Sequence, residues 1–291
     1  MNSYFYIILF STLSAMTRGL ISVIDRYQIG YKKQSVLKVN FLNNLYTLLF
    51  IIIALFYINV NQVFTMVLDY KIIIYSVLVQ IVAVGYSKIF KRLSIFESAI
   101  VSKIADFFIP LALFFTTGKI NFGNYFISIL TTLIVIIWVK KKSDLKTLLQ
   151  GVMIIVPPLV IQACLSPVLV GDYKKNMDSL ILFTVSTLIL RFVVSFISML
   201  PTLKWMEWKQ GNKNYFNKLY FFRAILTCIA QITFVFVTSS NNSSIAWIFL
   251  NITSLYGVIF SNLILKESKN KTEIYIIITV SAITILSQLF F

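Results

Sequence analysis

Five ionisable side chains lie inside long apolar stretches of this sequence: Arg18, Lys103, Asp106, Arg191 and Arg223. An ionised group in the hydrocarbon of a bilayer costs about 2.5–3.5 kcal/mol on insertion scales, so it faces a partner or a polar cavity. Four of the five groups are cations and one is an anion. If they share one cavity, its net charge of about +3 predicts an anionic or phosphate-bearing small-molecule substrate.

Arg191 is the strongest single candidate for substrate binding. It lies near the middle of the apolar stretch 179–200, which contains no acidic residue. A side chain at this depth has far to snorkel to either interface, so it should line a cavity or contact backbone carbonyls or Asp106. Arg18 and Arg223 lie nearer the cytoplasmic ends of their stretches and could snorkel to the headgroups or bind substrate.

Lys103 and Asp106 are three residues apart in the stretch 95–117. On one helix they would share a face and neutralise each other. Pro110 removes the helical donor to the carbonyl of Asp106, which predicts a kink. The pair could therefore line a substrate cavity, or it could be structural beside an ordinary kink. Asp106 is the only carboxylate placed deep in a stretch, so proton coupling would use it; counter-substrate exchange stays open.

Prolines are the candidate gating residues. Pro157 and Pro158 interrupt the hydrogen-bond ladder of the stretch 148–170, which suits either a bending gate or a static kink. Pro110 is the third candidate, for the same reason.

Neutral polar side chains could complete a binding site. Asn44, Gln162 and Asn251 lie in three different stretches and could hydrogen-bond a ligand. They could equally join helices, where such bonds are worth about 0.6 kcal/mol on average. The same two roles are open to Asn40, Asn43, Gln80 and Gln231.

The composition excludes an ordinary soluble domain and most enzyme chemistry. Apolar residues form 58% of the 291 residues, charged residues only 12%, and the mean hydropathy is +0.86. The absence of histidine excludes His-dependent catalysis and imidazole ligation of zinc or haem. Cys164 and Cys228 lie far apart in apolar stretches, and no paired acidic motif occurs. We therefore expect no metal, no cofactor and no enzymatic activity.

The elements that must position these side chains are helices that cross a membrane. A spanning segment needs about 20 apolar residues, and its backbone must satisfy its own hydrogen bonds. The sequence predicts an all-α membrane protein with ten transmembrane helices, near 4–24, 37–58, 71–90, 95–117, 121–139, 148–170, 179–200, 219–238, 245–265 and 273–291.

The basic residues predict the orientation of these spans. The loops after odd-numbered spans hold 18 of the 26 Lys and Arg residues, and the loops after even-numbered spans hold four. Basic residues in short loops stay on the cytoplasmic side, so the odd loops should be cytoplasmic and both termini outside. We expect a multi-pass protein of a bacterial inner (plasma) membrane. The net charge of +16 is divided among these loops, so the sequence predicts contact with the lipid bilayer and no nucleic-acid partner.

A basic linker at 140–146 divides five spans from five. An odd number of spans per half makes the halves antiparallel, so residues 1–142 and 147–291 are predicted to be two inverted five-helix repeats. Secondary transporters build a central site reachable from either face in this way. No Gly-Lys-Ser/Thr phosphate-binding loop is present, which argues against direct use of ATP.

The layout resembles the EamA-like ten-helix branch of the drug/metabolite transporter superfamily. The resemblance rests on Pro110 ahead of the hairpin Thr117-Gly118-Lys119-Ile120, on Leu263-Ile264-Leu265-Lys266-Glu267 ahead of the last span, and on Arg18-Gly19. It implies a secondary transporter of a small polar metabolite that works by alternating access. The alternatives are a flippase for a lipid or lipid-linked sugar, or a non-catalytic subunit of a membrane complex.

Overall fold

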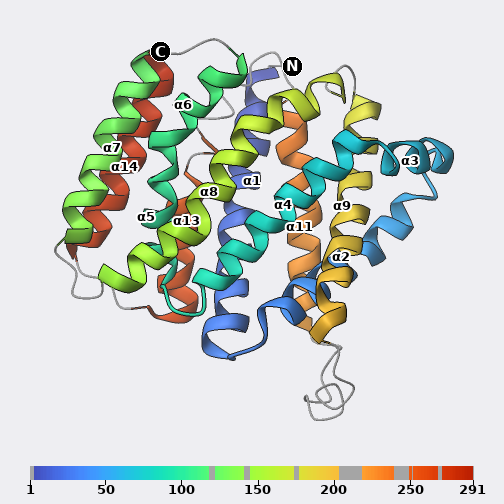
Figure 1. Cartoon of the computed structure of the whole chain (residues 1–291), viewed down its shortest axis with the longest axis horizontal. Helices are drawn as coiled ribbons and strands as arrows, with labels where there is room; N and C mark the ends of the chain where they lie inside the picture. The colour runs from blue at the N-terminus through green and yellow to red at the C-terminus, as the bar shows by residue number, and fades with distance from the viewer. Residues whose placement is uncertain are drawn as a thin grey trace.

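The computed structural model describes residues 3–117, 122–140, 145–173, 177–202, 218–238, 249–250, 252–267 and 271–290. These residues form helices and turns, with no strand among them, which confirms the all-α prediction (Figure 1). The helices are α1 (Ser3–Arg26), α2 (Val36–Ala54), α3 (Val60–Val67), α4 (Tyr70–Ile89), α5 (Ile95–Lys103), α6 (Ala105–Thr117), α7 (Phe122–Lys140), α8 (Leu145–Val170), α9 (Met177–Met199), α11 (Lys218–Thr238), α13 (Thr253–Phe260) and α14 (Lys271–Phe290). π-Helical turns η1 (Tyr27–Tyr31) and η4 (Ser261–Leu265) extend α1 and α13.

Five helical segments are long and apolar enough to cross a bilayer, as a multi-pass membrane protein requires. They are Phe5–Tyr31, Val36–Ala54, Tyr70–Ile89, Leu145–Ser166 and Asp178–Met199. The other predicted spans coincide with α5–α6, α7, α11, α13–η4 and α14, which do not meet this requirement over their described residues. The count of ten spans therefore stays a prediction.

The first helix is longer than the predicted span 4–24. It continues without a break through Asp25 and Arg26 into η1 and ends before Lys33, whose φ of 55° is left-handed. The two charged residues made the apolar stretch look shorter than the helix. As a result, Asp25 lies within a spanning helix, and Arg18 lies at the midpoint of the Phe5–Tyr31 segment.

The fourth predicted span is interrupted at Ile104, between Lys103 and Asp106. The Ile104 amide donates to the Val101 carbonyl, and the Phe107 amide donates to the Ile104 carbonyl, both at 3.3 Å. Lys103 therefore ends α5 and Asp106 lies in α6, and the turn between them comes six residues before Pro110. The side chains of Asp106 and Pro110 lie outside the described residues, so the Lys103–Asp106 pair and the kink at Pro110 stay predictions.

The prolines of α8 do not end their helix, because α8 runs from Leu145 to Val170 through Pro157 and Pro158. The connection between α2 and α4 contains a helix that was not predicted, α3. It begins at Asn59, whose side chain accepts hydrogen bonds from the amides of Asn61 and Gln62.

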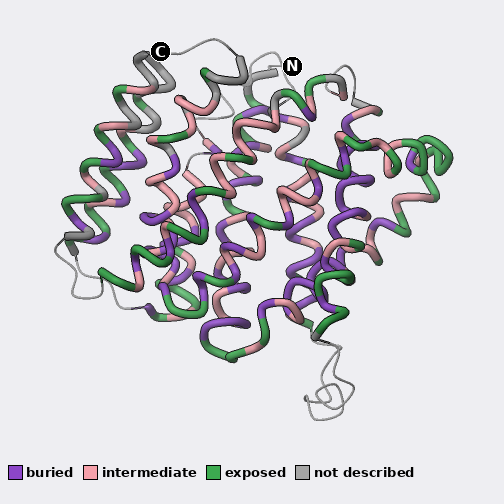
Figure 2. The backbone as a smooth tube through the Cα atoms, viewed as in Figure 1, coloured by how far each residue is buried: buried purple, intermediate pink, exposed green. Residues whose placement is uncertain are grey.

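The helices form one bundle, with α7 and α14 side by side at one edge and α3 at the opposite edge (Figure 1). The most extensive contacts are α1 with α11 and α4 with α8, followed by α1 with α13 and α2 with α9. Gly19 allows α1 to approach α13, because a Cβ there would lie 2.8 Å from the Gly257 nitrogen. Of the five long segments, α2 and α9 are the most buried and α8 the least. Figure 2 shows exposed positions along the outer helices, where large apolar side chains such as Met153 face outward, as lipid contact requires.

Contacts around Glu267 join the end of α1, the α4–α5 connection and the segment after η4 at one end of the bundle. Its carboxylate pairs with the Arg26 guanidinium at 3.1 Å and accepts a hydrogen bond from the Ile95 amide at 3.3 Å. Arg26 also donates to the carbonyl of Phe90. The labelled N and C termini lie together at the opposite end (Figure 1).

Candidate binding site in the bundle centre

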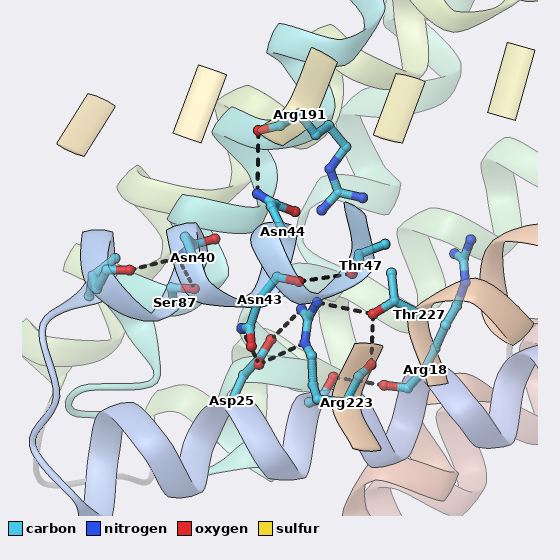
Figure 3. A network of polar contacts seen from close by, with 12 residues as sticks. Arg18, Asp25, Asn40, Asn43, Asn44, Thr47, Ser87, Arg191, Arg223 and Thr227 are labelled. Atoms are coloured by element: carbon cyan, nitrogen blue, oxygen red, sulfur yellow. Dashed lines mark hydrogen bonds and ion pairs between the residues drawn. The ribbon is translucent and has the colours of Figure 1, made fainter. Parts of the chain in front are cut away.

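An amide network joins α2, α4 and α9 in the interior. The Gln80 side-chain oxygen accepts hydrogen bonds from Asn44 at 3.2 Å and from Nε of Arg191 at 3.3 Å. Asn44 also lies 3.4 Å from the Arg191 carbonyl oxygen, and Asn40 donates to Ser87 at 2.8 Å (Figure 3). All five side chains are buried. Every bond in this network is neutral except the one from Arg191, so the network positions that arginine without neutralising its charge.

A second cluster holds the ion pair between α1 and α11. Two nitrogens of Arg223 donate to the two oxygens of Asp25, at 3.2 and 3.0 Å. Asn43 donates to the same carboxylate at 3.1 Å, and Arg223 also donates to Thr227 at 3.0 Å (Figure 3). Both ions are buried. Of the two roles left open for Arg223, snorkelling does not fit this buried pairing, and the expectation that Asp106 is the only deep carboxylate was wrong.

Arg191 is the least compensated of the buried cations. Its side chain is 6% exposed, and among the described residues the side chain makes one hydrogen bond, from Nε to Gln80. Within the described parts of the chain, its two terminal NH2 groups have no partner and no carboxylate pairs with it. It interacts electrostatically with Arg223, Arg18, Tyr75 and Asp25, and Figure 3 shows Arg18, Asp25 and Arg223 in the same region of the bundle.

Arg18 does not reach toward a membrane surface. Its guanidinium lies 4.0 Å from the ring centroid of Phe234 on α11, a cation–π contact, and it interacts electrostatically with Tyr75. No hydrogen bond or ion pair of its guanidinium occurs among the residues that the structure describes. Figure 3 shows its side chain in the same region as Arg191 and Arg223, so of the two roles left open for Arg18 snorkelling does not fit.

The centre carries a net positive charge. The described part of the centre holds three guanidinium groups, those of Arg18, Arg191 and Arg223, and one carboxylate, that of Asp25, which pairs with Arg223 and leaves two positive charges uncompensated. This net charge of two replaces the predicted net charge of about +3, because the prediction counted Lys103 and Asp106 and omitted Asp25. Donors and cations predominate, so the arrangement suits an anion.

Four of the eight predicted binding residues lie in this centre: Arg18, Asn44, Arg191 and Arg223. Lys103 and Gln162 lie on α5 and α8, which pack against each other and not extensively against α2, α9 or α11. Asn251 and the side chains of Asp106 and Pro110 lie outside the described residues.

Sequence reasoning missed two residues of the centre, Asp25 and Tyr75. Asp25 carried a signal, because Arg18, Ser22 and Asp25 follow one another at helical spacing and form a polar stripe that continues past residue 24. Tyr75 carried none, because a lone tyrosine in an apolar helix looks like any core aromatic residue.

Among the described residues, no group of three or more Cys, Asp or Glu side chains is arranged to hold a metal ion. No protein-family model matches the chain, and no curated protein is significantly similar to it.

Proposed function

We propose that this protein is a secondary transporter that carries a small anionic metabolite across a membrane by alternating access. The observation that carries the proposal is Arg191, a buried cation without a carboxylate partner among the described residues, in the middle of helices apolar enough to span a bilayer. Intramembrane charges of this kind mark substrate pathways. An anionic substrate would supply the missing counter-charge.

The packing pattern of the helices supports an inverted five-plus-five repeat. An inverted repeat would make each predicted span equivalent to the span five positions later in the chain, so α1 corresponds to α8 and α4 corresponds to α11. Under this correspondence the contact of α1 with α11 is equivalent to the contact of α8 with α4, and both are extensive. The contact of α1 with α13 becomes that of α8 with α5 and α6, and α2 with α11 becomes α9 with α4. The contacts α2–α9 and α7–α14 each join two equivalent helices, one from each half. Residues 1–142 and 147–291, folded as inverted repeats, would produce this pattern.

Two hydrogen bonds support the same correspondence. The Tyr220 hydroxyl at the start of α11 donates to Gln34 in the first connection, at 2.7 Å. The Tyr173 hydroxyl after α8 donates to Asp69 at the start of α4. The two bonds therefore link equivalent helix ends in the two halves. We propose on this basis, and on the resemblance described above, that the chain has the fold of the drug/metabolite transporter superfamily.

The test is transport by purified protein in lipid vesicles. We expect accumulation of labelled organic anions but not of organic cations, and loss of uptake in Arg191→Gln, which removes the uncompensated charge. The matched control is Arg92→Gln, because Arg92 is exposed and bonds only to Gln150 among the described residues. Uptake of cations alone, or full anion uptake by Arg191→Gln, would contradict the proposal.

A further inference from the structure

The uncompensated charge in the centre is concentrated on two arginines. Asp25 receives two hydrogen bonds from Arg223 and one from Asn43, so the only carboxylate that the described residues bring to the centre is already engaged. Arg191 and Arg18 have no carboxylate within bonding distance among the described residues. Each guanidinium carries a fork of N–H donors that matches a phosphate or carboxylate group. A ligand with two negative charges would neutralise these two cations.

Neutral donors accompany these two cations. Tyr75 interacts electrostatically with both Arg18 and Arg191, and its ring packs on Phe183 at 5.2 Å between centroids. Its hydroxyl makes no hydrogen bond with the residues that the structure describes. Thr187 lies one turn before Arg191 on α9, and its buried hydroxyl also lacks a partner in the described chain. Residues four apart share a helix face, so this donor is on the side of Arg191.

From this arrangement we infer that the centre binds a dianion, with Arg191 and Arg18 as its cationic contacts and Tyr75 as a neutral donor. The Asp25–Arg223 pair is a fixed internal ion pair and does not bind the ligand. The substrate class is a small organic molecule with two negative charges, either a phosphate monoester or a dicarboxylate. This inference rests on the proposed function only in assuming that the bound anion is then carried across the membrane.

Ligand-induced thermal stabilisation of the intact protein in detergent tests the inference. The probes are matched in size and differ in charge: succinate against monomethyl succinate, and glycerol 3-phosphate against glycerol, at pH 8. We expect one dianion to raise the melting temperature at concentrations where its matched partner does not. Which dianion does so distinguishes the dicarboxylate from the phosphate monoester.

Variants separate the two arginines from the internal pair. Loss of charge-assisted hydrogen bonds predicts that Arg191→Gln and Arg18→Gln each weaken dianion binding by about 10- to 100-fold. Tyr75→Phe should weaken it by about 3- to 10-fold, because one neutral donor is lost. The double variant Asp25→Asn/Arg223→Gln should retain binding within about threefold. It keeps both cationic contacts.

Several outcomes would overturn the inference: no stabilisation by either dianion, equal stabilisation by the matched partners, or unchanged affinity in Arg191→Gln. Arg191→Lys keeps the charge without the fork, and it provides a second measurement if the glutamine variant does not fold. The proposed function fails separately. If dianions bind as expected and vesicles show no transport, the binding site stands and the transporter does not. If only a monovalent anion is transported, the anion transporter stands and the dianion site does not.

Discussion

The buried ion pair of Asp25 and Arg223 gives a stability prediction at the scale of single residues. Asp25→Asn leaves Arg223 without its counter-ion and should destabilise the protein by about 3–5 kcal/mol. Arg223→Gln should cost less, because Arg191 still interacts electrostatically with Asp25. The double variant should regain most of the loss, since neither member of the pair is then left as a buried ion without its partner. Thermal unfolding in detergent measures all three.

The control for this cycle is Arg92→Gln, which removes an arginine from an exposed position and should change stability by less than about 0.5 kcal/mol. Strict additivity of the two single losses would show that the pair is not coupled, contrary to the observed geometry.

Residues that are unusual for their surroundings could be predicted from the sequence. An arginine in an apolar stretch stands out by itself, and Arg18, Arg191 and Arg223 indeed lie in one centre. Partners could not be predicted in the same way. Asp25 bonds to Arg223 across 198 residues, and no local pattern encodes a contact at that separation. Tyr75 becomes distinctive only in the folded protein, where it interacts electrostatically with Arg18 and Arg191.

At the scale of helices, the close approach of α1 and α13 depends on Gly19. A Cβ at this position would lie 2.8 Å from the Gly257 nitrogen, a backbone atom that cannot rotate away. Gly19→Ala should therefore separate the helices and lower stability by roughly 1–3 kcal/mol. Gly171→Ala is the matched control, because nothing lies within 4 Å of its Cβ position. Equal melting temperatures for the two variants would contradict a tight α1–α13 contact.

Helix positions could be predicted from the sequence better than helix ends and interruptions. Apolar stretches located the long helices because lipid contact requires them, whichever residues provide the apolar surface. The end of α1 was placed too early, because burial of Asp25 makes a charged residue compatible with a spanning helix. The interruption at Ile104 was not predicted, since no proline or glycine marks that position in the sequence.

The orientation of the whole molecule can be tested with single cysteines in a background that lacks Cys164 and Cys228. Lys91→Cys reports on an exposed odd-numbered loop, and Tyr57→Cys on an exposed even-numbered one. If basic loops are cytoplasmic, a membrane-impermeant thiol reagent should label Tyr57→Cys in intact cells, and Lys91→Cys only after permeabilisation. The opposite result would invert the proposed topology.

The long separation between Asp25 and Arg223 also bears on how the protein is made. At about 5–20 residues per second, the ribosome needs roughly 10–40 s to reach Arg223 after Asp25, which precedes it by 198 residues. Throughout that interval α1 exists without α11 or α13, its two main packing partners. The nascent first helix must therefore wait with an unpaired carboxylate, near the membrane surface or shielded by the insertion machinery, until the second half of the chain arrives. Assembly of the finished bundle is thus obligatorily late, and α1, the first helix synthesised, is among the last to reach its final contacts.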